Sequence, residues 1–443
     1  IYCSNLSYRT VTNTYRASLL LIAALSFAAG SEARGQTADR PNIVLIVADY
    51  MGYSDIGPYG ATDIQTPSLN ALADAGVRFS DYYSASPVCG PSRAALLSGF
   101  YPGRVGVESN IAAPDDGLSS RDSTLVRELK ASGYRTAMVG KWHLGRGADT
   151  SPTSHGFDSF LGFHTWTLGY HTHLTPAGEP GLFRDSDPVT EEGYLTDVFT
   201  NEATRFIEQN PANPFFLYLA YNTALPPYQR PDLPESEWDS GWDVNEATRE
   251  DYVAMVESMD QGIGRVLRTL DELELAENTL VIFTYDHGGR DLVRSAPLFH
   301  GFGTLWEGGI RVPLLMRWPG QFGAGRTLER PSIAMDITAT ILAAAGRDVE
   351  ALALDGSSLL PQLRNDARVP AQPLFWRIGP PMSATRAVRR ENWKYLVDQG
   401  SQFLFDLDAD IGERTNLFSA NPEIARELRT AVTQWEESLA VRR

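Results

Sequence analysis

The stretch SPVCGPSRAALLSG, residues 86–99, combines a sharp turn with the start of a helix. Pro91 suits a first helical turn, because the N–H that proline lacks is not needed there. Residues 94–97 are strong helix formers, so Cys89 is expected at or just before the helix N-terminus. Free N–H groups and the positive end of the helix dipole favour an anion at that place. Arg93 is expected about one turn further along the same helix.

A second informative stretch, GYRTAMVGKWHL, follows at residues 133–144. Residues 136–139 are apolar enough for a strand that is buried on both faces of a sheet. Lys141 and His143 come directly after this strand. Because residues two apart in an extended chain face the same way, both side chains are expected to enter one pocket, with Trp142 opposite.

Both stretches resemble the two signatures of the formylglycine-dependent sulfatases, arylsulfatase-like hydrolases of the alkaline phosphatase superfamily. The first signature is met at every fixed position, by Cys89, Pro91, Ser92, Arg93, Leu96, Ser98 and Gly99. The resemblance implies that a formylglycine-generating enzyme or an anaerobic sulfatase-maturing enzyme oxidises Cys89 to formylglycine, which hydrates and attacks sulfur beside a divalent metal ion. It also implies that Arg93, Lys141 and His143 bind the nucleophile and the sulfate. A small buried thiol is the plainer interpretation of Cys89.

Long apolar strands alternate with helices through most of the chain. Strands are expected at 42–48, 136–139, 214–222, 279–285 and 314–317, and helices at 66–76, 123–131, 194–209, 252–273 and 335–345. This alternation predicts an α/β protein with a mainly parallel sheet. The resemblance implies the alkaline-phosphatase-like form of that class, a large, mixed, mostly parallel sheet flanked by helices. It would assign the sulfatase catalytic domain to residues 40–346.

The pattern changes after residue 373. Short strands at 373–376, 386–388, 393–397 and 403–406 and a helix over 421–439 predict a small C-terminal subdomain, residues 373–443, with an antiparallel sheet plus helix. The Gly- and Pro-containing residues 347–372 are interpreted as a linker.

Acidic residues stand at the ends of two predicted central strands. Asp49 follows the strand 42–48, and Asp286 and His287 follow the strand 279–285. Ligands collect at the carboxyl ends of strands in open α/β sheets, although a strand-terminal Asp also serves as a turn or cap residue. The resemblance implies that Asp49, Cys89, Asp286 and His287 hold the metal, with Asp-His in place of the commoner Asp-Asn pair. We expect Ca²⁺, with Mg²⁺, Mn²⁺ or Zn²⁺ as alternatives.

Three positions depart from the family pattern. Tyr50 stands where a second acidic or amide ligand is usual, Leu225 stands nearest a usual His, and Phe302 replaces a usual Lys. The missing His and Lys normally bind sulfate and help to protonate the leaving alcohol, so the leaving-group site is atypical. His300, two residues before Phe302, is the hypothesised replacement for that acid.

The segment 147–195 is rich in Gly, Pro, Asp and Thr and contains four histidines, His155, His164, His171 and His173. Such loops usually carry specificity. We interpret these histidines as substrate-contacting or solvated rather than as a second metal site.

The N-terminal segment has the features of an export signal. Residues 17–29 form an apolar run that is too short to span a bilayer comfortably, basic residues precede it, and a small-residue cleavage site follows. We therefore expect a signal peptide over residues 1–33, an exported protein that is periplasmic or secreted, and no stable membrane anchor. Cys3 falls within this segment, which leaves Cys89 without a disulfide partner in the mature chain.

The net charge of −17 argues against a nucleic-acid partner, because phosphates require a basic surface. The sequence thus predicts a sulfatase that hydrolyses a carbohydrate or aryl sulfate, with a sulfated small molecule or glycan as its substrate. Two alternatives remain: a catalytically impaired protein that binds sulfated ligands, and a phosphodiester or phosphonate ester hydrolase on the same scaffold.

Overall fold

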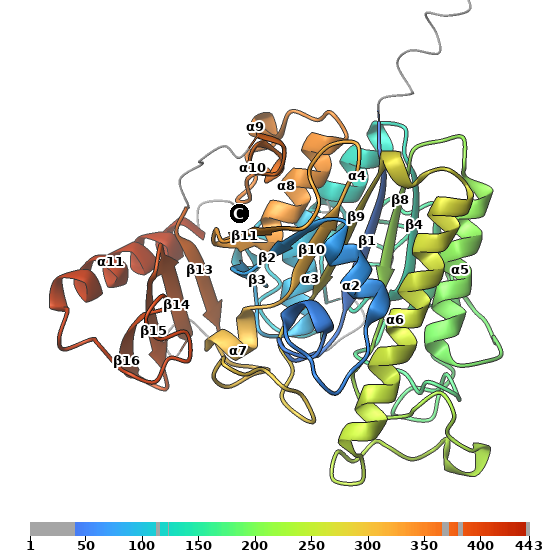
Figure 1. Ribbon diagram of the computed structural model, residues 1–443, viewed down its shortest axis with the longest axis horizontal. Coiled ribbons are helices and arrows are strands. Elements are labelled where there is room, and N and C mark those ends of the chain that lie inside the picture. Colours follow the sequence, from blue (N-terminus) through green and yellow to red (C-terminus); the bar gives the residue numbers. More distant parts are fainter. Residues whose placement is uncertain (1–39, 112–115, 123, 366–371, 380–383, 440–443) are drawn as a thin grey trace, which may run out of the picture. The chain divides into compact units, whose positions relative to one another are not determined.

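The computed structural model describes residues 40–111, 116–122, 124–365, 372–379 and 384–439 (Figure 1). The predicted signal peptide and Cys3 lie outside these residues. Pro41–Arg443 form one compact unit. Within the described part, no helix combines the length and the apolar character that a membrane crossing requires.

A ten-stranded sheet forms the centre of this unit, in the order β11-β2-β10-β9-β1-β8-β4-β5-β6-β7. The five strands β9 (Thr279–Tyr285), β1 (Asn42–Ala48), β8 (Phe215–Ala220), β4 (Arg135–Lys141) and β5 (Ser159–Phe163) run parallel. β1, β8 and β9 are buried along their whole length, as their continuous apolar sequences predict.

Shorter strands extend this parallel centre at both edges. On one side β10 (Leu314–Arg317) pairs antiparallel with both β9 and β2 (Val77–Phe79), and β11 (Arg326–Leu328) pairs parallel with β2. On the other side β6 (Phe183–Arg184) and β7 (Asp187–Pro188) are added antiparallel. The sheet is therefore mixed but mostly parallel, which confirms the predicted fold class.

Helices cover both faces of this sheet (Figure 1). One group, packed together, contains α2 (Pro67–Asp74), α5 (Leu195–Gln209) and α6 (Arg249–Glu272). The other contains α3 (Cys89–Ser98), α4 (Thr124–Ala131) and α8 (Ala334–Ala344). The predicted helices thus exist, with ends that differ by a few residues.

The predicted antiparallel sheet plus helix is present after residue 373. Its strands are β13 (Leu374–Ile378), β14 (Thr385–Arg390), β15 (Trp393–Asp398) and β16 (Ser401–Asp406), and α11 (Pro422–Leu439) packs on β14 and β15. Trp376 and Leu396 of this sheet share a buried apolar cluster with Tyr83 and Ile310, far upstream in the chain. The division into two domains remains a prediction.

Two local expectations need correction. The interpretation of residues 347–372 as a linker is wrong where they are described, because α9 (Val349–Leu352) and α10 (Leu360–Asn365) form there and Leu363 enters the main core. Residues 77–83 contain two strands, β2 and β3 (Tyr82–Tyr83), and β3 pairs with β12 (Ser332–Ile333). The expected loop 147–195 contains β5, whose apolar SFLGF sequence is buried beside β4.

Candidate active site

The carboxyl ends of the parallel strands bring the predicted residues together. Asp49 follows β1, Lys141 ends β4, and Asp286 and His287 follow β9. The backbone N–H of Asp286 donates to the carbonyl of Ala48 at 3.0 Å, which extends the pairing of β1 and β9 to their polar ends. The site is therefore fixed by the sheet itself.

Cys89 is the first residue of α3 and faces these strand ends. Val88, in extended conformation, caps the helix, so the expected place of Cys89 at the N-terminus agrees with the structure. The Sγ atom lies 3.3 Å from Lys141 Nζ, 3.1 Å from His287 Nε2 and 3.9 Å from Asp49 Oδ1. Only 4% of the residue is exposed. The thiol thus stands among charged groups and not in an apolar core.

Arg93 lies one turn along α3 and is completely buried. Its guanidinium donates to Asp286 Oδ2 and Asp49 Oδ2, each at 3.0 Å, and to the carbonyl of Lys141 at 2.8 Å. These bonds engage each of its three nitrogens. Arg93 therefore holds the two carboxylates in place, and its expected contact with the nucleophile or the sulfate stays a prediction.

Four side chains converge in a way that fits a metal ion. One potential ligand atom from each of Asp49, Cys89, Asp286 and His287 lies within 4.8 Å of the others, and all four residues are buried. Asp286 Oδ1 has no hydrogen-bond partner among the described residues. A buried carboxylate oxygen without a partner is costly, and a divalent cation would satisfy it. The donor set of two carboxylates and an imidazole fits such an ion.

The charges of the cluster balance one another. Burial lowers the pKa of Lys141, but the neighbouring Asp49 carboxylate raises it above its usual value, so Lys141 stays charged. Burial likewise opposes, and the Asp286 carboxylate favours, the protonation of His287, whose pKa rises to about 9. A cation bound by these carboxylates would displace that proton, because a ligating imidazole must be neutral.

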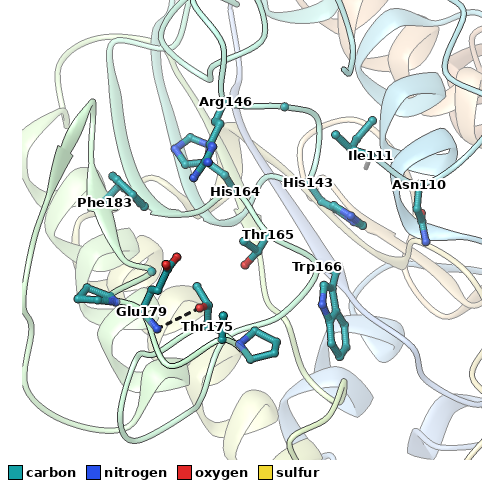
Figure 2. Close-up of a pocket in the computed structure, with 15 residues that line it drawn as sticks. Asn110, Ile111, His143, Arg146, His164, Thr165, Trp166, Thr175, Glu179 and Phe183 are labelled. Atoms are coloured by element: carbon teal, nitrogen blue, oxygen red, sulfur yellow. Dashed lines mark hydrogen bonds between the residues drawn. The ribbon is translucent and has the colours of Figure 1, made fainter. Parts of the chain in front are cut away.

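His143 connects the cluster to a cavity of about 570 Å³ (Figure 2). It is 3% exposed, has a φ of 53° in the left-handed region, and its Nδ1 atom lacks a partner within the described ranges. Burial, together with the charges of Lys141 and Arg93, holds its pKa well below the usual value. His143 is therefore a neutral imidazole at the wall of the cavity.

The cavity wall combines polar and aromatic side chains. Figure 2 shows Asn110 near His143, with Trp166, Arg146 and Glu179 around the same space. The Asn110 Oδ1 atom accepts from the backbone N–H of Gly90 at 3.0 Å, which joins the cavity to the turn that carries Cys89. Trp166 is 43% exposed. These features are those of a site for a polar ligand that also offers a flat face for stacking.

The four histidines of residues 147–195 have separate positions. His164 lines the cavity. His155, His171 and His173 each place Nε2 about 3 Å from a backbone carbonyl, of Leu118, Arg230 and Gly193 respectively. His155 and His173 are buried, so the interpretation of these two as solvated is wrong; their rings bond the backbone instead.

Tyr50 and Phe302, two of the three residues that depart from the family pattern, form an aromatic wall beside the four candidate metal ligands. The backbone of Tyr50 has a φ of 59°, and its hydroxyl donates to Asp291 Oδ2 at 2.8 Å, away from the metal-ligand candidates. The ring of Phe302 lies 5.0 Å from that of Tyr50 and 5.1 Å from that of His287, measured between centroids. Leu225 is buried.

His300 does not join the cluster through any contact of the described residues. Its exposed ring packs on Phe299 and Trp306, at centroid distances of 4.1 Å and 5.3 Å, and it lines a second cavity together with Phe302.

Asn110, Trp166 and Asp291 were not singled out from the sequence. They come from irregular segments, where no periodicity marks a residue as facing a site.

Comparisons with known proteins agree with this geometry. The family model described as "Sulfatase" matches residues 41–347, and one described as "N-sulphoglucosamine sulphohydrolase, C-terminal" matches residues 300–438. Arylsulfatase A of Bos taurus is 32% identical, over 93% of this chain and 89% of its own. Steryl-sulfatase of Mus musculus is 33% identical, over 78% of this chain and 69% of its own.

Solved structures are similar over almost the whole chain. Ps i-CgsB, solved in complex with k-i-k-neocarrahexaose, superposes with a TM-score of 0.81 and 32% identity, over 89% of this chain and 92% of that one. The PsFucS1 sulfatase from Pseudoalteromonas sp. gives 0.74 and 25% identity, over 92% and 91%. Family matches, sequence identity and fold agree, and the chain belongs to the sulfatase family, whose members are sulfuric ester hydrolases.

Proposed function

We propose that the protein hydrolyses a sulfate ester of a saccharide by means of a formylglycine that is made from Cys89, next to a bound divalent cation. One observation carries this proposal: Cys89 begins a helix and meets Lys141, His287 and Asp49 at the ends of three parallel strands. A thiol with a purely structural role has no need of such partners.

The formylglycine and the divalent cation each have a defined place in this proposal. A hydrated formylglycine at position 89 would supply two hydroxyls, one to attack sulfur and one whose deprotonation would release sulfate, and a divalent cation would lower their pKa. Asp49, Asp286 and His287 would hold the cation. Arg93 keeps both carboxylates in place, and Lys141, whose Nζ lies 3.3 Å from Sγ, holds an oxygen at that position.

Proton transfer requires a base and an acid. His143 is neutral and its Nδ1 atom has no partner in the described part of the chain, so it is suited to accept the proton that is lost when sulfate is released. His300 remains our proposal for the acid that protonates the leaving alcohol. It lines the cavity that adjoins Phe302, and a substrate reaching this cavity would bring the alcohol towards it.

The residues that line the cavity at His143 support a saccharide as the substrate. Arg146, Glu179 and Asn110 offer hydrogen bonds to hydroxyl groups, and Trp166 offers a face for a sugar ring. Two relatives provide a parallel, since Ps i-CgsB was solved with a neocarrahexaose and the N-acetylgalactosamine-6-sulfatase of Homo sapiens is named after a sugar. An aryl sulfate is the alternative substrate.

We propose Ca²⁺ as the cation, because two carboxylates dominate the ligand set. Mn²⁺ or Zn²⁺ are the next choices, because His287 offers a nitrogen ligand and the Tyr50 hydroxyl is bonded to Asp291 instead of offering an oxygen ligand. Mg²⁺ is a further choice. Metal analysis of the purified protein distinguishes these ions.

Maturation and export complete the proposal. Cys89 is 4% exposed in the folded protein, so a maturing enzyme would have to reach it before the chain folds. We propose that residues 1–33 direct export, and that the mature protein is periplasmic or secreted.

The proposal is tested by sulfate release from the protein after co-expression with a maturing enzyme. We expect release from an aryl sulfate and from at least one monosulfated saccharide, and none from Cys89→Ala. Phosphate mono- and diesters serve as the comparison substrates. Faster turnover of a phosphodiester than of every sulfate ester would favour a phosphoryl hydrolase and contradict the proposal.

The role of His300 has its own test. Because phenols leave with little help, His300→Ala should lower kcat/KM on a saccharide sulfate by about 10²-fold or more and on an aryl sulfate by much less. Equal losses on both substrates would remove His300 from the mechanism.

A further inference from the structure

A second cavity, of about 640 Å³, shares Phe302 with the aromatic wall of the candidate active site. Nearly all of its lining comes from residues 289–304, the segment between β9 and α7 (Glu307–Ile310), near the α7 label in Figure 1. Arg414, from the loop after β16, completes it. Two distant parts of the chain therefore build one cavity.

The charge of this cavity is opposite to that of the chain. The protein has a net charge of −17, yet the lining contains Arg290, His300 and Arg414 and no carboxylate. Arg290 pairs with Asp291 at 3.3 Å, which offsets its charge. Arg414 forms no ion pair within the described ranges. Its guanidinium charge is therefore available to an anion.

Arg414 is held in place at both ends. Its backbone N–H donates to Asp410 Oδ2 at 2.7 Å, and its guanidinium carbon lies 4.4 Å from the centre of the Phe299 ring. The preceding residue, Glu413, is buried and accepts from the backbone N–H of Glu307 at 2.6 Å. A guanidinium stacked on a ring keeps its N–H groups free at the edge and loses little freedom when an anion binds.

Backbone hydrogen bonds tie the cavity to the reacting groups. The N–H of Gly303 donates to the carbonyl of Pro87 at 3.1 Å, just before Cys89. The N–H of Gly289 donates to the carbonyl of Met51 at 2.9 Å, just after Asp49 and Tyr50. The segment that lines this cavity is therefore fixed to the chain on either side of the cluster, two residues before Cys89 and two residues after Asp49.

We propose that this cavity binds a second sulfate group of a multiply sulfated saccharide while another of its sulfates is hydrolysed at Cys89. The guanidinium of Arg414 supplies the forked, charge-assisted hydrogen bonds that a tetrahedral oxyanion accepts. The inference rests on the proposed function and narrows its substrate class from sulfated to multiply sulfated saccharides. It gives the atypical segment around Phe302 a role in recognition.

The test compares inhibitors of aryl sulfate hydrolysis. A short dextran sulfate oligomer offers many sulfates, and inorganic sulfate offers one. In Arg414→Gln the inhibition constant for dextran sulfate, divided by that for inorganic sulfate, should rise about tenfold over wild type, because one charge-assisted contact is lost. The matched control is Arg121→Gln, which removes the same charge from another cavity and should leave the ratio within about twofold.

An unchanged ratio in Arg414→Gln, or an equal rise in both variants, would overturn the inference. If wild type hydrolyses no sulfate ester, aryl or saccharide, the proposed function fails, and calorimetry on Cys89→Ala protein decides the inference separately. There, dextran sulfate should bind about tenfold more weakly when Arg414→Gln is added. Equal affinity would overturn it.

Discussion

Two clusters of buried charges lie at the two ends of the segment between β9 and α7, and they differ in how their side chains are arranged. The first contains Asp49, Arg93, Lys141 and Asp286 around Cys89. The second joins α7 to the C-terminal sheet: Lys394 Nζ lies 2.8 Å from Glu307 Oε1 and 2.8 Å from Glu413 Oε1. Both clusters bring carboxylates and cations together at almost no exposure.

In the second cluster, each ion is matched with an ion. Glu307 Oε2 accepts from the Tyr83 hydroxyl at 2.6 Å and from Arg311 at 3.2 Å, in addition to its pair with Lys394. In the first, Asp286 Oδ1 accepts no hydrogen bond in the described structure and meets only the His287 ring, at 3.5 Å, within a group of four potential ligand atoms that face one another. Glu413 Oε1 of the second cluster also lacks a hydrogen bond, so neither buried charge nor one such atom marks a function; the convergence of four potential ligand atoms does.

The largest expected effect comes from removing the charge of Asp286 in the first cluster. Asp286→Asn should lose the bound cation and lower kcat/KM by about 10³-fold or more, since such an ion contributes several kcal/mol to the transition state. Metal content and sulfate release measure both effects. Asp291→Asn, next to the cluster but outside it, is the control and should keep its metal. A variant Asp286→Asn with full metal content would contradict the assignment.

Breaking the second cluster should affect folding and not chemistry. Lys394→Met leaves Glu307 and Glu413 without their shared cation, and should lower the free energy of unfolding by about 3–5 kcal/mol. Denaturant unfolding measures this. Lys130→Met removes an exposed pair with Asp158 and should cost less than about 1 kcal/mol. Equal losses in the two variants would show that the buried pairs carry no special stability.

The second cluster should also give stability a pH dependence of known sign. Burial raises the pKa of Glu413 from 4.5 to about 7, although Lys394 lowers it. A raised folded pKa means that its contribution is present below about pH 4.5 and is lost as the pH rises towards 7. In Glu413→Gln this part of the decline should disappear. Thermal unfolding from pH 4.5 to 7.5 checks it, and an unchanged pH profile would exclude Glu413.

The smallest expected effect tests whether the Tyr50 hydroxyl belongs to the first cluster. Tyr50→Phe removes the hydroxyl that donates to Asp291 and should cost about 1 kcal/mol of stability. Metal content should remain the same, because that hydroxyl points away from the ligand atoms. A loss of metal in Tyr50→Phe would place the hydroxyl among the ligands after all.

Sequence reasoning predicted the first cluster well and the second hardly at all. Asp49, Lys141 and Asp286 end long apolar strands, and local periodicity together with the rule for parallel sheets brings them to one edge. Glu307, Lys394 and Glu413 meet through packing of a small sheet on α7, across long sequence separations that no local pattern encodes. The buried Leu363 shows the same limit, because Gly and Pro around it suggested a linker.

The contacts of Arg93 could be predicted only in part. Its place on α3 followed from helical spacing, but its bonds to two carboxylates depend on the register of β1 and β9. Trp166 and Arg414 come from loops, so their positions beside cavities became visible only in the structure.

The central claim, that Cys89 is the source of a formylglycine nucleophile, is tested most directly by the mass of the tryptic peptide that contains it. The protein should be isolated after expression with a maturing enzyme. The account predicts a peptide in which the –CH₂SH group has become an aldehyde or its hydrate. A peptide that retains the thiol in protein that is fully active in sulfate release would contradict it.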